Sequence, residues 1–409
     1  MNKLLLQAPL MAMLASTTVF ADSKVYDESS FIEAIDYANA DNSIEHIIFE
    51  KNVHISLTSP IIYTGSQDIE FIGNNAIIDG TSAGSFTLDN DLTAVTEDGT
   101  IMFNTAANIS IQRLSVVNSA TRGIVVNIPE SAQGEDIQVS LHKVHIADTA
   151  LYGLHIDDNA DEFDDGISGS DIGIELNISY SSFTGNGTGA IDFDGVRVDE
   201  RGLGDITAVI KNTHIDANGG DGIELDEGGE GGVDATMRHV TLNGNGFYNA
   251  EDLDDGFDID EAGAGDIKVT LVNVEVKNNQ DEGLDFDETG EGSVELKLHN
   301  VVAMDNADEG IKVDEEDAGD IEAKFTKVMV MGSGDDGIQF TELGEGTIEA
   351  SLKKVSAIDN KKYGIKMEQW VEEDEGAIIE EAGELKLQKV TLSGNAKGDE
   401  LKLNNIDVQ

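Results

Sequence analysis

The chain has 409 residues and carries 81 acidic residues against 25 lysines and arginines, which gives a formal net charge of −56. Such a charge repels nucleic acids and anionic membrane surfaces, so neither is expected as a partner. The absence of cysteine excludes disulfides, thiolate nucleophiles and cysteine-based metal sites. Because 39% of the residues are hydrophobic, the chain can still build a long core, and its acidity does not indicate disorder.

The first 21 residues have the pattern of a cleavable export signal. Lys3 precedes an apolar stretch that begins at Leu4, and Val19-Phe20-Ala21 fits a signal peptidase site. A membrane anchor is the alternative, but the apolar run is too short to span a bilayer and no charge cluster follows it. We therefore predict a signal peptide at 1–21 and an exported protein, periplasmic or extracellular, whose mature chain does not insert into the membrane.

Residues 22–60 are predicted to form an N-terminal cap and the first strands. Ser29 or Ser30 is suited to N-cap a short amphipathic helix, because the apolar residues after it fall at helical spacing. These residues are Phe31, Ile32, Ala34, Ile35 and Ala38. Alternating apolar positions then indicate strands over residues 44–49, 53–57, 69–72 and 76–79. A helix at this place would cover the open end of a sheet.

Residues 61–409 are predicted to form one repeat array. A phrase made of an acidic residue, a glycine, two alternating apolar residues and an acidic pair recurs along it, as in 221–227 and 255–261. The repeat glycines are Gly123, Gly153, Gly195, Gly222, Gly256, Gly283, Gly310, Gly337 and Gly364. Five of the eight intervals between them are 27 residues long, and the other three are longer. The array is therefore one fixed unit with insertions, the larger two between Gly153 and Gly195 and between Gly222 and Gly256.

Each unit contains three short strand signals and no helical period. After Gly256, for example, Ile267, Val269 and Leu271 alternate with polar residues, as they would in a half-buried strand. An asparagine recurs four residues before the next glycine, where stacked amides would hydrogen-bond from coil to coil. These are Asn218, Asn279, Asn306 and Asn360. The pattern predicts an all-β solenoid of parallel sheets, with three short strands per coil of about 27 residues.

The repeat resembles that of the right-handed parallel β-helix proteins with the pectate-lyase-like fold. The resemblance is carried by the pattern apolar-x-apolar-x-x-Asn-x-x-x-Gly-Ile-x-apolar, the asparagine ladder and the cap helix, and it covers nearly all of 22–409. It implies a right-handed solenoid of about a dozen coils, roughly 55–60 Å long at about 4.8 Å per coil. It implies no single function, because lyases, hydrolases, adhesins and phage spikes share this fold.

The acidic residues are phased to the repeat, which predicts calcium sites. They occupy the position before the repeat glycine and the positions four and five residues after it. In stacked coils, carboxylates about 4.8 Å apart repel by roughly 3.5 kcal/mol at an effective dielectric of 20, and Ca²⁺ would relieve this repulsion more readily than Mg²⁺. The predicted ligands are Asp199, Asp221, Asp226, Asp255, Asp260, Glu282, Asp287, Glu309, Asp314 and Asp336. The alternative is a solvated acidic face with diffuse counterions.

Catalytic candidates come from the position two residues after the repeat glycine, where charges of both signs follow one another. A polysaccharide lyase needs a cation to neutralise a uronate and a basic side chain to abstract a proton, and Arg197 beside Glu224 and Asp258 suits those roles. The alternative is an ordinary strand face with ion pairs between coils. Asp335-Asp336 looks like the paired aspartates of polygalacturonases, but the repeat itself explains it, and the other motifs of those enzymes are absent.

The sequence thus predicts an exported acidic β-helix that binds Ca²⁺ and acts as a structural, adhesive or glycan-binding module. Its expected partner is a glycan or an extracellular matrix. The alternative is a Ca²⁺-dependent polysaccharide lyase or glycoside hydrolase that acts on an acidic polysaccharide. Within the second insertion, Phe247 and Tyr248 would either stack on a sugar ring or cover the edge of the core.

Overall fold

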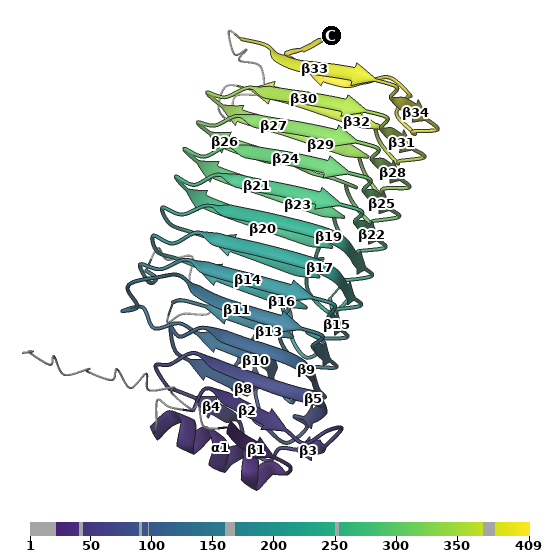
Figure 1. Cartoon of the computed structure of the whole chain (residues 1–409). Helices are drawn as coiled ribbons and strands as arrows, with labels where there is room; N and C mark the ends of the chain where they lie inside the picture. Colours follow the sequence, from purple (N-terminus) through teal and green to yellow (C-terminus); the bar gives the residue numbers. More distant parts are fainter. Residues whose placement is uncertain are drawn as a thin grey trace, which may run out of the picture.

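The computed structural model describes residues 22–40, 44–89, 92–96, 98–159, 168–249, 253–370 and 381–409. The predicted signal peptide, 1–21, lies outside these ranges. The described chain winds into a solenoid in which each coil stacks on the one before it, from the cap helix α1 (Glu28–Ala40) at one end to the C-terminus at the other (Figure 1). The fold class predicted from the repeat is confirmed.

Two large parallel sheets run the length of the solenoid, and we call them sheet A and sheet B. Sheet B has 12 strands, one per coil. In chain order these are β4 (Ile61–Tyr63), β8 (Gly99–Asn104), β10 (Arg122–Asn127), β13 (Leu154–Asp157), β16 (Val196–Glu200), β18 (Ile223–Glu227), β20 (Phe257–Gly263), β23 (Leu284–Gly290), β26 (Asp314–Asp317), β29 (Ile338–Gly344), β32 (Ile365–Trp370) and β35 (Lys402–Asn404).

Sheet A has 22 strands and bends at a corner, so that most coils contribute two strands or one long bent strand. Its members are β1 (Asp22–Val25), β2 (His46–Phe49), β3 (His54–Ser56), β5 (Ile69–Asp79), β9 (Ile109–Val117), β11 (Ile137–His142), β12 (His145–Ala147), β14 (Ile174–Ser179), β15 (Ser182–Thr184), β17 (Ile206–Asp216), β19 (Val233–Asn243), β21 (Ile267–Val272), β22 (Glu275–Lys277), β24 (Val294–His299), β25 (Val302–Met304), β27 (Ile321–Thr326), β28 (Met329–Met331), β30 (Ile348–Lys353), β31 (Ser356–Ile358), β33 (Gly383–Gln388), β34 (Thr391–Ser393) and β36 (Ile406–Val408).

The repeat fixes the register of the stack. Ile267 pairs with Val294, Val294 pairs with Ile321, and Ile321 pairs with Ile348, so that each step is 27 residues. All four side chains are fully buried. Because successive residues of a strand point to opposite faces, this register stacks apolar side chains inside the solenoid and leaves the alternate positions on its outer faces.

The asparagine ladder is confirmed and is longer than the sequence analysis found. Asn218 donates to Asn245 at 3.0 Å, and Asn279 donates to Asn306 at 3.1 Å. Asn186, Asn245 and Asn395 belong to the same ladder, which Ser333 interrupts. These amides are buried, and their bonds from coil to coil satisfy groups that would otherwise destabilise the core.

The cap helix forms as predicted, but its start differs. Asp27 precedes the helix, and its carboxylate accepts a hydrogen bond from the backbone N–H of Ser30 at 2.8 Å, so Asp27 is the N-cap in place of Ser29 or Ser30. Phe31 packs edge-on against Phe49 of β2, which closes the core at this end. Ile32 is 38% exposed and does not belong to the packed face of the helix.

A small apolar cluster lies outside the main core, at the N-terminal end of sheet B. The antiparallel hairpin of β6 (Thr87–Leu88) and β7 (Ala94–Val95) contributes Ala94 to it. The other buried members are Leu151, Tyr152, Ala190 and Phe193. Tyr152 lies 4.5 Å from the ring of His155, which is completely buried. The cluster therefore closes sheet B's outer face from solvent near β13.

Candidate cation-binding site

The outer face of sheet B carries a band of charged side chains, which we call the acidic band. It is formed by the residues two and four after each repeat glycine, which alternate with buried residues and point away from the core, and by the residue before the glycine, as in Asp194, which lies 3.9 Å from Arg197. In the coils of β16 to β26, the position two after the glycine is held by Arg197, Glu224, Asp258, Asp285 and Lys312. Fixed cations therefore stand at both ends of this run, and carboxylates lie between them.

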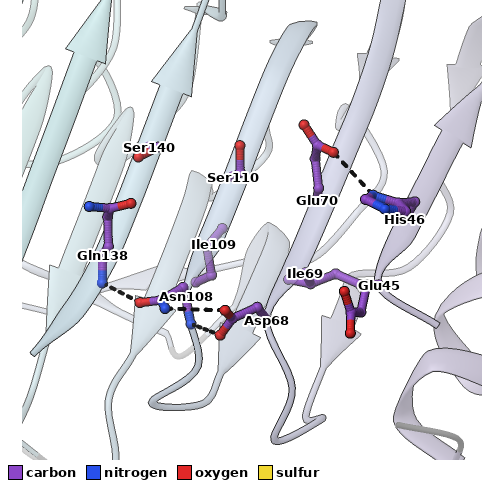
Figure 2. A pocket seen from close by; sticks show the side chains of 10 residues that line it. All are labelled: Glu45, His46, Asp68, Ile69, Glu70, Asn108, Ile109, Ser110, Gln138 and Ser140. Atoms are coloured by element: carbon purple, nitrogen blue, oxygen red, sulfur yellow. Dashed lines mark hydrogen bonds and ion pairs between the residues drawn. The ribbon is translucent and has the colours of Figure 1, made fainter. Parts of the chain in front are cut away.

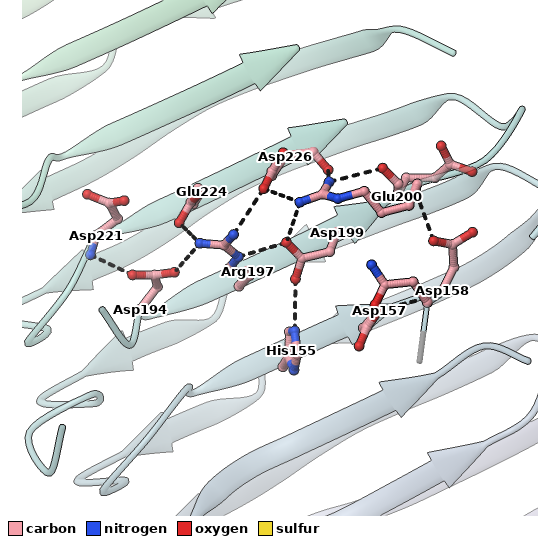
Figure 3. A network of polar contacts seen from close by, with 12 residues as sticks. His155, Asp157, Asp158, Asp194, Arg197, Asp199, Glu200, Asp221, Glu224 and Asp226 are labelled. Atoms are coloured by element: carbon pink, nitrogen blue, oxygen red, sulfur yellow. Dashed lines mark hydrogen bonds and ion pairs between the residues drawn. The ribbon is translucent and has the colours of Figure 1, made fainter. Parts of the chain in front are cut away.

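Arg197 neutralises the carboxylates at the N-terminal end of the acidic band (Figure 3). Its guanidinium bonds to Asp199 at 2.8 Å and to Asp226 at 3.0 Å, and it also contacts Glu224. Arg201 binds Asp226 as well. Burial opposes the ionisation of Asp199, but the charge of Arg197 and the hydrogen bond from His155 outweigh it and lower the pKa of its carboxyl group. The predicted calcium ligands Asp199 and Asp226 are thus already neutralised by side chains of the protein.

His155 extends the Arg197 network toward the N-terminal end. Its Nε2 lies 2.9 Å from Asp199 and its Nδ1 lies 3.1 Å from Arg122 Nη1. Because the guanidinium only donates, Nδ1 accepts and Nε2 donates its proton to the carboxylate, so this geometry selects the neutral imidazole. Since the ring is fully buried, His155 supports the network and offers no surface to a substrate.

Lys312 neutralises the carboxylates at the C-terminal end of the acidic band. Its Nζ lies 2.8 Å from Asp285 Oδ2 and 3.1 Å from Asp287 Oδ2, with Asp314 at 3.7 Å and Glu282 at 3.8 Å. Burial disfavours the charged amine, but these carboxylates outweigh it and raise the pKa of Lys312. Three further predicted calcium ligands, Glu282, Asp287 and Asp314, therefore share one lysine.

Between the two ends lies a coil without a compensating cation. Oxygens of Asp221, Glu224 and Asp258 lie within 4.8 Å of one another, and so do those of Asp255, Asp258 and Asp285. In the described part of the chain, no ion pair involves Asp221, Asp255 or Asp258. Burial, then the charges of neighbouring aspartates, raises the pKa of Asp258 well above its ordinary value. Asp258 is the residue that both groups share.

Two oxygens at this coil are buried without a partner. Asp255 is 8% exposed and Asp285 is 6% exposed, yet neither Oδ1 has a hydrogen-bond donor among the described residues. A buried carboxylate oxygen normally has at least one donor or a cation. The second oxygen of Asp285 is held by Lys312, and Asp285 also belongs to the oxygen group around Asp258.

The remaining predicted ligands have other surroundings. Glu309 forms an oxygen group with Asp308 and Asp335, and Lys362 pairs with Asp335. Asp336 accepts a hydrogen bond from the backbone N–H of Tyr363 at 2.5 Å. Burial raises the pKa of Asp260 to about 6. The ten predicted ligands thus do not form one uniform row, and Asp221 and Asp255 are the two that meet at Asp258.

Asp285 was not among the predicted ligands and Asp258 was predicted as a catalytic candidate, and the structure brings both into one group of carboxylate oxygens. The signal for both lay in the position two residues after the repeat glycine, which the register places in line with Glu224. The catalytic assignment of Arg197, Glu224 and Asp258 stays a prediction. The structure places them on three adjacent strands, with Arg197 and Glu224 in contact and the arginine enclosed by carboxylates.

The acids five residues after the repeat glycine turn away from the acidic band. Each points into the turn between sheets B and A, where Glu227, Glu261 and Glu288 accept the backbone N–H four residues later at 3.0–3.2 Å. Their other oxygens are buried without a partner among the described residues. Burial, then contacts between glutamates of neighbouring coils, sets the pKa of each at about 8. This column is a buried glutamate ladder, and Gln369 continues it.

Other surface features carry weaker signs of a ligand. A polar hollow of about 330 Å³ lies over the first coils of sheet A (Figure 2). Several of its side chains are held by hydrogen bonds, since Glu70 pairs with His46 at 3.1 Å and Asp68 accepts the backbone N–H of Asn108.

The two aromatic residues of the second insertion differ in their surroundings. Tyr248 donates a hydrogen bond to the carbonyl of Gly189, which favours a role in covering the edge of the solenoid, whereas Phe247 is 47% exposed. No helix in the described ranges is long and apolar enough to cross a membrane.

Comparisons with known proteins concern the fold. No family model and no curated protein matches the sequence. The A-module of mannuronan C-5 epimerase AlgE6 from Azotobacter vinelandii matches over 95% of both chains at 12% identity, with a TM-score of 0.55. The AlgE4 A-module of the same organism covers the same shares at 12% identity and a TM-score of 0.46. The Streptococcus pneumoniae surface protein and adhesin PfbA matches 94% of this chain and 97% of its own at 10% identity and a TM-score of 0.34. The chain is thus a right-handed parallel β-helix protein of the pectate-lyase-like fold, as its repeat predicts.

Proposed function

We propose that this chain is an exported glycan-binding module that holds Ca²⁺ in the acidic band and uses it to bind an anionic polysaccharide. The observation that carries the proposal is the coil of Asp258, whose carboxylates have no cation of the protein although Arg197 and Lys312 neutralise the coils on either side. The expected ligands of the ion are Asp221, Glu224, Asp255, Asp258 and Asp285.

The donor set suits calcium. It consists only of carboxylate oxygens, which hard cations prefer, and it comes from three neighbouring coils. Ca²⁺ accepts six to eight oxygens in flexible geometry, whereas Mg²⁺ demands near-ideal octahedral coordination. Ca²⁺ bound here would keep coordination positions on its solvent side for a carboxylate of a ligand.

The ligand class follows from charge. In a chain with a net charge of −56, the acidic band repels a polyuronate unless a divalent cation bridges the two. The AlgE6 module is named for an enzyme of mannuronan, and the proposal extends that ligand class, an anionic polysaccharide, to this chain. A structural or adhesive role is favoured over an enzyme because Arg197, the candidate base, is enclosed by four carboxylates that keep it protonated.

The test is thermal unfolding with Ca²⁺, with Mg²⁺, with EDTA and with NaCl at matched ionic strength. A ligand at 100 times its dissociation constant adds roughly 2.7 kcal/mol per site. We expect a rise in the melting temperature that is specific to Ca²⁺, and binding of polymannuronate that requires Ca²⁺. An equal rise with NaCl would reduce the effect to screening and remove the metal site. Cleavage of polyuronates, seen as unsaturated products, would favour the lyase alternative.

A further inference from the structure

The corner of sheet A is free of acidic side chains along ten successive coils. Two adjacent residues form it in each coil: the last residue of the first strand and the residue after it, from 112–113 to 388–389. Acidic residues are 81 of 409, or about one in five, so these twenty positions would hold about four. They hold none.

Basic residues occupy many of the corner positions at which acidic residues are absent. In the N-terminal half of the corner these are Arg113, Lys143, Lys211 and Arg238, and all four are exposed. Lys211 and Arg238 are direct partners in register on β17 and β19, so two like charges stack on neighbouring coils. Like charges at such positions repel and destabilise a sheet.

The C-terminal half of the corner repeats the arrangement. Lys327, Lys353, Lys354 and Lys389 are exposed at the ends of β27, β30 and β33. In Figure 1 these strands run toward the side that carries the labels β28, β31 and β34. We call these four and the four of the N-terminal half the basic ridge. Ten coils at about 4.8 Å make it roughly 43 Å long.

The cations of the basic ridge have no acidic partner in the part of the chain that the structure describes. None of the eight forms an ion pair with a carboxylate of the described residues, whereas Arg197 and Lys312 each contact several. In a chain with more than three acids for each base, this separation keeps a positive track apart from the acidic band. Uncompensated charges on one face attract ligands of opposite charge.

Backbone geometry provides a second, independent observation. The second residue of each corner has a positive φ, between 50° and 60°, a conformation that asparagine tolerates far better than lysine or arginine. Asn212, Asn273 and Asn300 occupy it in three coils. Lys327 and Lys354 occupy the same position with φ of 58° and 55°. Folding alone would favour asparagine there, so the lysines stand against the backbone preference, as residues at many binding sites do.

We propose that the basic ridge is a second binding surface, which takes a linear anionic polysaccharide directly, without a metal ion. This inference shares the ligand class of the proposed function but does not depend on its calcium site. The ridge is one or two side chains wide and many coils long, which suits a single extended chain with a negative group on successive sugars. Tyr180 is 59% exposed and lies edge-on to His142 at 5.7 Å, so an aromatic face is available for a sugar ring.

Other polyanions fit less well. A membrane surface or a nucleic acid duplex is wider than the ridge and would meet the acidic residues beside it, such as Glu322 and Glu349 on the same strands of sheet A. A second copy of the chain would bring its acidic band against the ridge, but it would also bring most of a net charge of −56 against an equal charge. These occupants are outcomes of the test below.

The experiment measures binding of the full chain to polymannuronate in EDTA at low ionic strength. The test variant carries Lys327→Asn and Lys354→Asn, which remove two charges and place the residue that the backbone prefers. The control variant carries Lys361→Asn and Lys397→Asn, which are exposed and off the ridge. We expect roughly tenfold weaker binding in the test variant, unchanged binding in the control, and an equal or higher melting temperature in the test variant.

Several results would overturn the inference. One is equal loss in both variants, and another is no loss in the test variant. Binding that appears only with Ca²⁺ and disappears in Asp258→Asn would place the glycan on the acidic band and support the proposed function alone. Binding of single-stranded nucleic acid without binding of polymannuronate would identify another ligand. Self-association at low salt that the test variant abolishes would make the occupant a second copy of the chain.

Discussion

Asp258 and Asp285 are partners in register on β20 and β23, and their carboxylate oxygens lie within 4.8 Å of each other. Asp285 has Lys312 on its far side, whereas Asp258 has another acid, Glu224, on its other side. The repulsion between these groups is therefore relieved on one side only. A cation bound at Asp258 would therefore relieve more carboxylate repulsion than one bound at Asp285.

The first prediction is that Asp258→Asn removes the response to Ca²⁺. The substitution takes away the residue that both oxygen groups share, so the Ca²⁺-specific rise in melting temperature should vanish. In EDTA the variant should be more stable than the parent, by about 1 kcal/mol, because the repulsion between the half-buried Asp258 and the buried Asp285 is lost. Asp234→Asn, on the exposed face of sheet A, is the matched control and should leave both measurements unchanged. A full Ca²⁺ response in Asp258→Asn would place the ion elsewhere.

The second prediction concerns Lys312, which acts as a built-in counterion. Lys312→Ala leaves Asp285 and Asp287 without their cation, so the free energy of unfolding in EDTA should fall by roughly 1–3 kcal/mol. Ca²⁺ should recover more stability in this variant than in the parent, because the vacated coil becomes an additional site. Lys268→Ala, whose partner Asp266 is exposed, is the control and should show neither effect. Calorimetric titration would count the ions, and an unchanged number would contradict the counterion role.

The third prediction separates structure from catalysis at Arg197. Its guanidinium holds Asp199, Glu224 and Asp226 together in a buried network, so Arg197→Ala should destabilise the fold by roughly 3–5 kcal/mol. Arg238→Ala, at an exposed site, should change stability by less than about 0.5 kcal/mol. Chemical denaturation measures both. A variant at Arg197 that keeps its stability but loses a polyuronate-cleaving activity would support the enzyme alternative.

Sequence reasoning reached the fold because a β-helix repeats one set of contacts. The interval of 27 residues fixed which apolar residues stack, and Ile267, Val294 and Ile321 meet as the alternation predicts. The asparagine ladder followed for the same reason, although Asn186 and Asn245 were hidden by the insertions that break the interval. The N-cap Asp27 was missed because Ser29 and Ser30 are equally good caps by residue type.

The site could be located but not resolved from sequence. Periodicity places carboxylates in columns, yet it does not say which way a column turns, and the glutamates after Asp226, Asp260 and Asp287 point into the turn. Periodicity also does not say how far a long cationic side chain reaches along the stack of coils. Arg197 spans to the next coil and Lys312 reaches back to the previous one, so only the coil between them is left without a charge partner.

The fourth prediction is that the buried glutamate ladder makes the solenoid less stable in alkali. The ordinary glutamate pKa is 4.5, and burial raises that of Glu227, Glu261 and Glu288 to about 8 in the folded chain. The folded state therefore binds more protons than the unfolded state between these values. The stability that the protons confer is complete below about pH 4.5 and is lost as the pH rises through 8.

Glu261→Gln tests this prediction, because glutamine keeps the shape of the protonated carboxyl and already occupies the ladder at Gln369. At pH 9 the variant should be more stable than the parent by on the order of 1 kcal/mol or more, and at pH 5 the two should be nearly equal. Glu349→Gln, on the exposed face of sheet A, should leave the pH dependence unchanged. Denaturant unfolding at pH 5, 7 and 9 gives all three comparisons. If Glu261→Gln instead lowered stability equally at each pH, the glutamates would be ionised in the folded chain, and the unpartnered oxygens of the ladder would need a cation in place of protons.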